Sequence, residues 1–575
     1  MPETADLILT GGDVLTIDAA FTVAQAGAVR DRRILAVGSD AEIAAYAGPT
    51  TRVVELAGRT VLPGINDSHL HAAAWALTSP PFALDISHPA VRSISDIADA
   101  VRKAAAETPT GAWITGLGWD NGYLAECLAD PERRPRRADL DAAAPDHPVC
   151  LTDFSGHMVW VNSKALALAG IARGTESPSG GVIETDAAGE PTGILKETAQ
   201  ALVQGLVPPA TVAERKAAIR SAVAALHAEG ITSYTEPGLG PGGAEILGGG
   251  LDTGTLHAYV ELATAGELEA RVRVLLLPAP MGGSAAEVTS GLRGLAVPDE
   301  VDARRLAIIG IKVFADGVPP NETAWMHEPY TGGGHGALCV HGADAGLKEA
   351  ELAEMIRVAH AAGYQLGVHV TGDRAIDAVV EAFAAATATH PRPDARHYVI
   401  HGDFASPQSL AKLAEHGYGI NMNPAIKWTI ADLMDDIVGS ARSDYQWPVR
   451  SAAEAGIAVC VGSDAPITQP NWRRGIAAML LRESKATGRV SGPDQRVSLE
   501  TALRAYTVNA ARQDFAEEWK GTIEPGKVAD LCVIGGDLRA ADPHDIPDLP
   551  IDLTVFDGRI VYERDGEGAS GGGEA

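Results

Sequence analysis

Two histidines one residue apart follow a short apolar run, in the segment Pro63-Gly64-Ile65-Asn66-Asp67-Ser68-His69-Leu70-His71. In an extended chain, residues i and i+2 point to the same side, so His69 and His71 can offer two imidazoles to one metal ion. Such pairs also arise by chance. The pair alone is equally compatible with two hydrogen-bonded histidines at a strand end.

A lysine stands by itself in the apolar run Gly310-Ile311-Lys312-Val313-Phe314-Ala315. A buried, unpaired ammonium group is costly. Either Lys312 reaches outward between helices, or it reacts as a neutral amine with carbon dioxide. We favour the second hypothesis, in which the carbamate is an anionic ligand bridging two metal ions. Burial lowers the pKa of a lysine and supplies the neutral amine.

Three further apolar runs end in His369, His401 and Asp464. Taken singly, each side chain is more typical of a hydrogen-bonded polar residue in a core. Taken together with the two runs above, five predicted strands end in a side chain able to bind metal. Neutral imidazole and carboxylate groups suit zinc, and catalytic zinc sites keep a position open to water.

These residues belong to a regular alternation of strand-like runs and Ala-rich amphipathic stretches, which is typical of βαβ units and a parallel sheet. Eight such strands predict an α/β fold, a (β/α)8 or TIM barrel, with its active site at the carboxyl ends of the strands. The predicted strands are residues 61–66, 231–235, 272–278, 310–315, 365–370, 396–401, 418–423 and 458–463. The candidate ligands all stand at or near such ends.

Short strands broken by turns occupy both ends of the chain. Neither end has enough strands to close a sheet, so we expect the two ends to form one small β-sandwich together. The predicted organisation is a β-sandwich (N-terminal part, 1–60), barrel strand 1 with the histidine pair (61–78), an inserted subdomain (79–210), the remainder of the barrel (211–520), a β-sandwich (C-terminal part, 521–564) and a disordered tail (565–575).

Composition excludes several classes of partner. The 575 residues carry 46 Lys+Arg against 75 Asp+Glu, a net charge of −29, which disfavours binding to nucleic acid and to anionic membranes. No apolar run approaches the roughly 18–20 residues that span a bilayer. The acidic N-terminus is unlike a signal peptide. The five cysteines contain no CxxC pair, which is typical of a reducing cytoplasm. We therefore expect a cytoplasmic protein, with a homodimer left open.

Five segments together resemble the amidohydrolase superfamily and, within it, amidohydrolase family 3, the YtcJ-like group. They are PGINDSHLH (63–71), GIKVFADG (310–317), HVTGDRAID (369–377), HGDFASP (401–407) and GSDAP (462–466). The resemblance covers nearly the whole chain except its last dozen residues. The loop at 318–326 also resembles that of N-substituted formamide deformylases.

The resemblance implies that His69 and His71 bind one metal ion, that His369 and His401 bind a second, and that Lys312 bridges them as a carbamate. Asp464 would contact the first ion and act as general base and acid. Two zinc ions per chain are expected, and one remains compatible with the sequence. The implied reaction is hydrolysis of a non-peptide, amide-type C–N bond by metal-activated hydroxide.

Several tryptophans follow predicted strand ends or lie in the insertion, which favours a small apolar or aromatic substrate. The candidate substrate-binding residues are Trp75, Trp119, His157, Trp325 and Trp428, and Trp472 follows a strand end in the same way. The alternative is that these rings pack the mouth of the barrel.

Two other functions stay open on the sequence alone. One is a ring-amine deaminase, although deaminases of the resembled superfamily usually hold one metal and lack the bridging lysine. The other is a metal-free binding module. The presence of all six candidate ligands argues against it.

Overall fold

The computed structural model describes residues 3–130, 132–154, 156–178, 181–243 and 250–564, and the tail predicted at 565–575 lies outside them. The chain forms two compact units. Unit 1 comprises Met1–Ala72 and Arg220–Ala575, and unit 2 comprises Ala73–Ile219. The inserted subdomain expected at 79–210 stays a prediction, because compactness alone does not show that a segment folds independently.

Unit 1 contains the predicted barrel. Its eight-stranded sheet has the order β8-β15-β16-β17-β18-β19-β20-β21, and every neighbouring pair is parallel. The strands are β8 (Ile65–Asp67), β15 (Ile231–Leu239), β16 (Arg271–Leu276), β17 (Leu306–Phe314), β18 (Gln365–Val370), β19 (Tyr398–His401), β20 (Gly419–Met422) and β21 (Val459–Val461). The backbone N–H of Ser68 donates to the carbonyl of Val461 (3.3 Å), which joins the first strand to the last. The (β/α)8 prediction is therefore confirmed.

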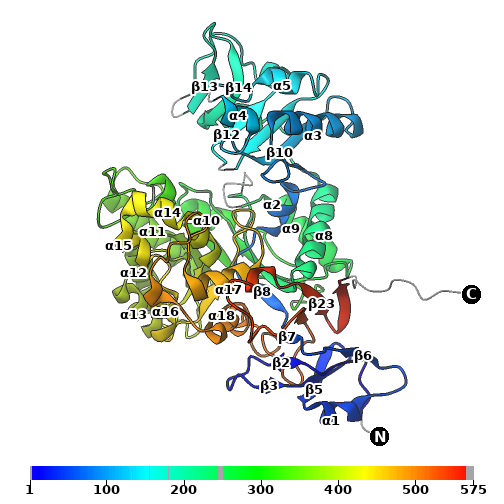
Figure 1. Cartoon of the computed structure of the whole chain (residues 1–575). Coiled ribbons are helices and arrows are strands. Elements are labelled where there is room, and N and C mark those ends of the chain that lie inside the picture. The colour runs from blue at the N-terminus through cyan, green and yellow to red at the C-terminus, as the bar shows by residue number, and fades with distance from the viewer. Residues whose placement is uncertain (1–2, 131, 155, 179–180, 244–249, 565–575) are drawn as a thin grey trace, which may run out of the picture. The chain divides into compact units, whose positions relative to one another are not determined.

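Helices cover the outside of this sheet, with α8 and α9 on one side of β8 and α12 and α13 on the other (Figure 1). Both faces of each strand are thus buried, which explains why the strands read as continuous apolar runs. The helices are α8 (Val212–Ala228), α9 (Thr253–Thr264), α10 (Ala285–Gly291), α11 (Ala345–Ala361), α12 (Asp373–Thr389), α13 (Pro407–Glu415), α14 (Pro424–Val438), α15 (Ser440–Tyr445), α16 (Val449–Glu454), α17 (Trp472–Leu481), α18 (Leu499–Ala505) and α19 (Val508–Gln513). None of the described helices combines the length and apolarity needed to cross a bilayer.

The first barrel strand differs from its prediction at residues 61–66. That run is two strands in two sheets: β7 (Thr60–Pro63) pairs with the C-terminal strand β22, and β8 begins after Gly64. A side chain at Gly64 would lie 2.2 Å from Thr232 Oγ1. Only glycine therefore allows the chain to pass this closely from one sheet to the next.

Both chain ends build the additional sheets, as expected. One sheet has the order β5-β4-β1-β6 and the other β24-β23-β22-β7-β2-β3, so blue N-terminal strands lie beside red C-terminal ones (Figure 1). The strands are β1 (Leu7–Thr10), β2 (Asp13–Leu15), β3 (Val23–Ala24), β4 (Ala26–Arg30), β5 (Arg33–Gly38), β6 (Arg52–Glu55), β22 (Leu531–Ile534), β23 (Ile551–Phe556) and β24 (Arg559–Glu563). Residues from both chain ends share one hydrophobic core, which includes Leu7, Val29, Val533 and Val555.

Unit 2 has its own six-stranded sheet, in the order β13-β14-β12-β11-β10-β9. The strands are β9 (Leu84–Asp85), β10 (Ile114–Trp119), β11 (Val149–Asp153), β12 (Met158–Val161), β13 (Gly181–Thr185) and β14 (Pro191–Glu197). The helices are α2 (Ala72–Leu77), α3 (Ile94–Glu107), α4 (Ala125–Ala129), α5 (Arg137–Asp141), α6 (Ser163–Leu168) and α7 (Ala201–Gln204). Its core includes Ile97, Leu151 and Trp160.

Candidate metal centre

Three of the predicted ligands meet at the carboxyl ends of β8 and β21. One ligand atom from each of His69, His71 and Asp464 lies within 4.8 Å of the other two. Asp464 Oδ1 is 3.2 Å from His69 Nε2 and 3.5 Å from His71 Nε2. All three side chains are buried. Residues almost four hundred positions apart in the chain thus share one small volume.

The backbone around Asp67 holds these two strand ends together. Its carboxylate accepts from the N–H of His69 (3.2 Å) and from the N–H of Ser463 (3.1 Å), and the N–H of Asp464 donates to the His69 carbonyl (2.8 Å). Burial raises the pKa of Asp67 to about 7. Asp67 was not among the residues predicted from the sequence, although it stands two residues before the histidine pair, at the end of the same strand.

His401 and His369 continue the cluster. Their ring centroids are 4.6 Å apart, and the His401 ring lies 5.2 Å from that of His69. His401 Nδ1 lies 2.8 Å from Asn423 Oδ1, and His369 Nε2 lies 3.2 Å from the carbonyl of Gly317. Because these oxygens only accept, each ring uses one nitrogen as a donor and keeps a lone pair on the other. Asn423 was also missed, although it ends a predicted strand.

Lys312 lies on β17 with 2% of its surface exposed. Its Nζ is 5.1 Å from the centroid of the Phe314 ring, which in turn lies 5.3 Å from the His369 ring. Within the described part of the chain, Lys312 makes neither a hydrogen bond nor an ion pair. Burial lowers its pKa to about 7, although the charge of Asp464 opposes the shift. The lysine side chain is therefore inside the fold, and an outward orientation between helices is wrong.

The donor set fits a divalent cation such as zinc. Two ligand atoms, each about 2.0–2.2 Å from a tetrahedral zinc ion, are about 3.3–3.5 Å apart, which is close to the distances from Asp464 Oδ1 to the two imidazoles. Burial lowers the pKa of His71 to about 3 and that of His69 well below its ordinary value. Burial also lowers the pKa of His369 and of His401. Neutral imidazoles are the form that binds metal.

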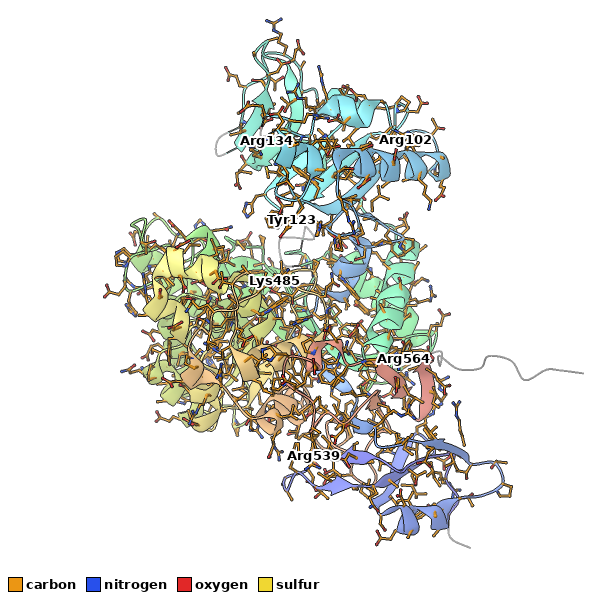
Figure 2. The ribbon with its side chains drawn as sticks, in the orientation of Figure 1. Arg102, Tyr123, Arg134, Lys485, Arg539 and Arg564 are labelled. Carbon is orange, nitrogen blue, oxygen red and sulfur yellow. The ribbon has the colours of Figure 1, made fainter. Side chains whose placement is uncertain are left out.

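Two of the candidate substrate contacts lie in unit 1. Trp325 is 4% exposed, its backbone N–H donates to Asp316 Oδ2 (2.9 Å), and the Arg374 guanidinium stands 4.1 Å from its ring centroid. Trp428 is half-buried between two cations. Arg474 is 4.5 Å from its ring centroid, and Lys485, labelled in Figure 2, is 5.3 Å away. Trp428 is therefore less buried than Trp325.

The remaining candidates differ in their surroundings. In unit 2, Trp75 is half-buried on α2, His157 Nδ1 lies 3.0 Å from Glu197 Oε2, and Trp119 is 1% exposed with its indole N–H donating to the carbonyl of Leu151. The contacts of Trp119 are those of a core residue. Substrate contacts by these three stay predictions. Trp472 in unit 1 is also buried, with its indole N–H bound to the Glu229 carbonyl (2.7 Å), so it packs α17.

The chain is similar to several known proteins. The profile of the amidohydrolase family matches residues 52–562. An N-substituted formamide deformylase from Arthrobacter pascens is 28% identical over 98% of this chain and 100% of its own. The putative amidohydrolase YtcJ of Bacillus subtilis (strain 168) is 30% identical over 90% of this chain and 92% of its own.

A solved structure shares the fold. An uncharacterized metal-dependent hydrolase from Pyrococcus furiosus superposes with a TM-score of 0.71 at 24% identity, covering 93% of this chain and 99% of its own. The chain belongs to the amidohydrolase family. Its reaction class is metal-dependent hydrolysis of an amide-type carbon–nitrogen bond.

Proposed function

We propose that the chain hydrolyses the amide bond of a small, uncharged or weakly charged substrate that carries an apolar or aromatic substituent. N-substituted formamides are the leading class. The observation that carries the proposal is the convergence of His69, His71 and Asp464 within 4.8 Å, at the carboxyl end of the barrel. This is the end at which barrel enzymes place their catalytic groups.

The chain offers ligands for two cations. His69, His71 and Asp464 would hold the first, and His369 and His401 the second. Lys312, as a carbamate formed with carbon dioxide, would bridge them. Support for this last role comes from a buried lysine that has neither a hydrogen bond nor an ion pair among the described residues and has a pKa of about 7, so that much of it is the neutral amine required. We propose zinc, because imidazole nitrogen and carboxylate oxygen suit it.

Each bound cation would polarise the scissile carbonyl and lower the pKa of a water molecule toward neutrality. Asp464 would accept a proton from the attacking water and return it to the leaving nitrogen. One O–H bond of water and the C–N bond break, a C–O bond and an N–H bond form, and the products are a carboxylic acid and an amine. Asp67 would hold Asp464 next to His69, because its carboxylate accepts from the backbone N–H groups of His69 and Ser463.

The substrate class rests on two kinds of support. Trp428, half-buried on α14, would offer apolar surface to such a substituent. The similarity to an N-substituted formamide deformylase, which extends along 98% of the chain, favours formamides among the amides. The net charge of −29 disfavours polyanionic substrates by long-range repulsion.

A substrate panel tests the proposal. Zinc-reconstituted protein is incubated with N-benzylformamide, N-butylformamide, acetanilide, a cyclic amide and adenine, and released formate, acetate, amine or ammonia is measured. We expect amine and formate from the two formamides, and loss of turnover after chelation that zinc reverses. Deamination of adenine without hydrolysis of any amide would instead establish the deaminase alternative.

A further inference from the structure

The imidazole of His71 lies between two carboxylates. Its Nε2 faces Asp464 Oδ1 at 3.5 Å, and its Nδ1 faces Glu236 Oε1 at 4.0 Å. Glu236 lies on β15, and its side chain is 1% exposed. The nitrogen that would bind metal and the nitrogen behind it thus each have an acidic neighbour. Glu236 has no role in the proposed ligand set.

Two buried tyrosines hold Glu236 in place. The hydroxyl of Tyr259, on α9, donates to Glu236 Oε2 (2.7 Å), and the hydroxyl of Tyr234 lies 3.1 Å from that of Tyr259. Each hydroxyl has a single proton, and Tyr259 gives its proton to the carboxylate, so Tyr234 must donate to Tyr259. Burial, followed by the charge of Glu236, raises the pKa of Tyr259 well above its ordinary value, so this donor keeps its proton.

This chain of hydrogen bonds has one direction, from Tyr234 through Tyr259 to Glu236. Glu236 Oε2 accepts from Tyr259, and Glu236 Oε1 faces the one His71 nitrogen that does not point at Asp464. At 4.0 Å the contact is electrostatic, and a shift of about 1 Å makes it a hydrogen bond. An imidazole that donates from Nδ1 must carry its lone pair on Nε2.

We propose that Glu236 is a positioning residue that acts through His71. It fixes the tautomer with the proton on Nδ1 and directs the Nε2 lone pair into the site shared with His69 and Asp464. Tyr259 and Tyr234 keep the carboxylate oriented for this role. The inference rests on the proposed metal site, and it follows the general rule that a carboxylate behind a ligating imidazole orients the ring and raises its basicity.

The test is the zinc affinity of the apoprotein, measured by competition with a chromophoric chelator. Glu236→Gln keeps the shape of the side chain and removes its charge, so we expect zinc binding at the first site to weaken by about 10- to 100-fold. Tyr259→Phe should weaken binding less, because the carboxylate remains but loses its anchor. Tyr234→Phe, one bond further away, should have the smallest effect of the three.

Two control variants separate positioning from general damage. Glu454→Gln removes an exposed carboxylate that pairs with Arg450, and Tyr418→Phe removes a buried hydroxyl that contacts Thr387 (2.6 Å). Both should bind zinc as the unaltered protein does. The thermal midpoint of each metal-free variant is measured alongside, because a purely structural role would lower that midpoint and leave the affinity of the folded protein unchanged.

The outcomes distinguish this inference from the function on which it rests. If the unaltered protein binds zinc, and both Glu236→Gln and Tyr259→Phe bind it with unaltered affinity, the positioning role is wrong and the metal site stands. If the unaltered protein binds no zinc after reconstitution, both are overturned. A loss of zinc affinity that is largest in Glu236→Gln, smaller in Tyr259→Phe and smallest in Tyr234→Phe supports the positioning role.

Discussion

Two buried lysines in the barrel unit have opposite surroundings. Lys520 follows α19, and its ammonium donates to Asp514 Oδ2 (2.6 Å) and to Ser233 Oγ (2.5 Å). Asn66 Nδ2 donates to the same carboxylate oxygen (2.7 Å). Lys312, equally buried, has no hydrogen bond or ion pair among the residues described. Burial lowers both pKa values, that of Lys520 to about 8 against its Asp514 partner and that of Lys312 to about 7.

The difference shows how the fold separates stability from chemistry. Toward the N-terminal ends of the strands lie ion-paired charges. Arg271, for example, donates to Asp530 Oδ1 (2.9 Å) and to Asp557 Oδ1 (3.2 Å). At the carboxyl ends, neutral imidazoles, a carboxylate and an unpaired lysine face one another. Perturbed, incompletely paired groups are typical of functional sites, and the following variants test whether the two regions behave as this contrast implies.

The largest effect is expected at the unpaired lysine. Lys312→Ala should lose bound metal and abolish turnover, because it removes the bridging ligand without leaving a charge buried. Short carboxylic acids such as formate or acetate should partly restore both. Metal content and turnover with and without added acid are the measurements. A Lys312→Ala variant with full metal content and native turnover would contradict the carbamate.

The paired lysine should behave in the opposite way. Lys520→Met leaves Asp514 buried without its cation, and breaking such a pair costs about 3–5 kcal/mol of the free energy of unfolding. Chemical denaturation measures this loss, while kcat and KM of the folded enzyme should be unchanged. The matched control is Lys412→Met, which removes an exposed ion pair with Glu381 and should cost at most about 1 kcal/mol. Reduced turnover with unaltered stability in Lys520→Met would refute the contrast.

Two substitutions of buried carboxylates test the same contrast between the two regions. Asp464→Asn keeps the side-chain shape but cannot act as a base near neutral pH, so turnover should fall by about 100-fold or more while the fold survives. Asp514→Asn should instead lower stability and spare catalysis. Turnover on the best substrate and thermal unfolding are measured for both. Near-native turnover by Asp464→Asn would overturn its role in proton transfer.

The smallest effect concerns the substrate. Trp428→Ala should raise KM for N-benzylformamide by a few-fold to about tenfold, the range expected for losing one aromatic contact. The KM for N-butylformamide should change less, because its substituent has no ring to stack. Trp325→Ala is the comparison variant, because the Trp325 ring is buried and lies against the Arg374 guanidinium. Equal changes in KM for both substrates would show that Trp428 only packs.

The sequence was sufficient for the barrel and for the family because both follow from local patterns. Apolar strand runs and the polar residues that end them are visible in the chain, and those strand ends meet at one edge of a parallel sheet. The division at Gly64 was missed although the run at 61–66 contains the dipeptide Pro63-Gly64, which often interrupts a strand. It depends on the close approach of Thr232 in a distant segment.

The contacts that hold the candidate ligands in place could not be predicted from the sequence, for a similar reason. Asp67 stands in the first motif and Asn423 ends the predicted strand at 418–423. Their partners Ser463 and His401 are set by how strand ends meet in space. The tryptophans show another limit of prediction from the sequence. Trp472 follows a predicted strand end as Trp428 does, yet Trp472 is buried and Trp428 is half-buried. Position after a strand predicts which loop a ring occupies, and packing decides whether the ring is accessible.

The most direct test of the account is the number of metal ions held at the carboxyl end of the barrel. Protein reconstituted with zinc and freed of excess ions is analysed for metal content, together with His71→Ala, His401→Ala and the Lys520→Met variant. The account predicts two zinc ions per unaltered chain, fewer in both histidine variants and two in Lys520→Met. One ion per unaltered chain would contradict the bridged pair, and no bound transition metal after reconstitution would contradict the metal centre itself.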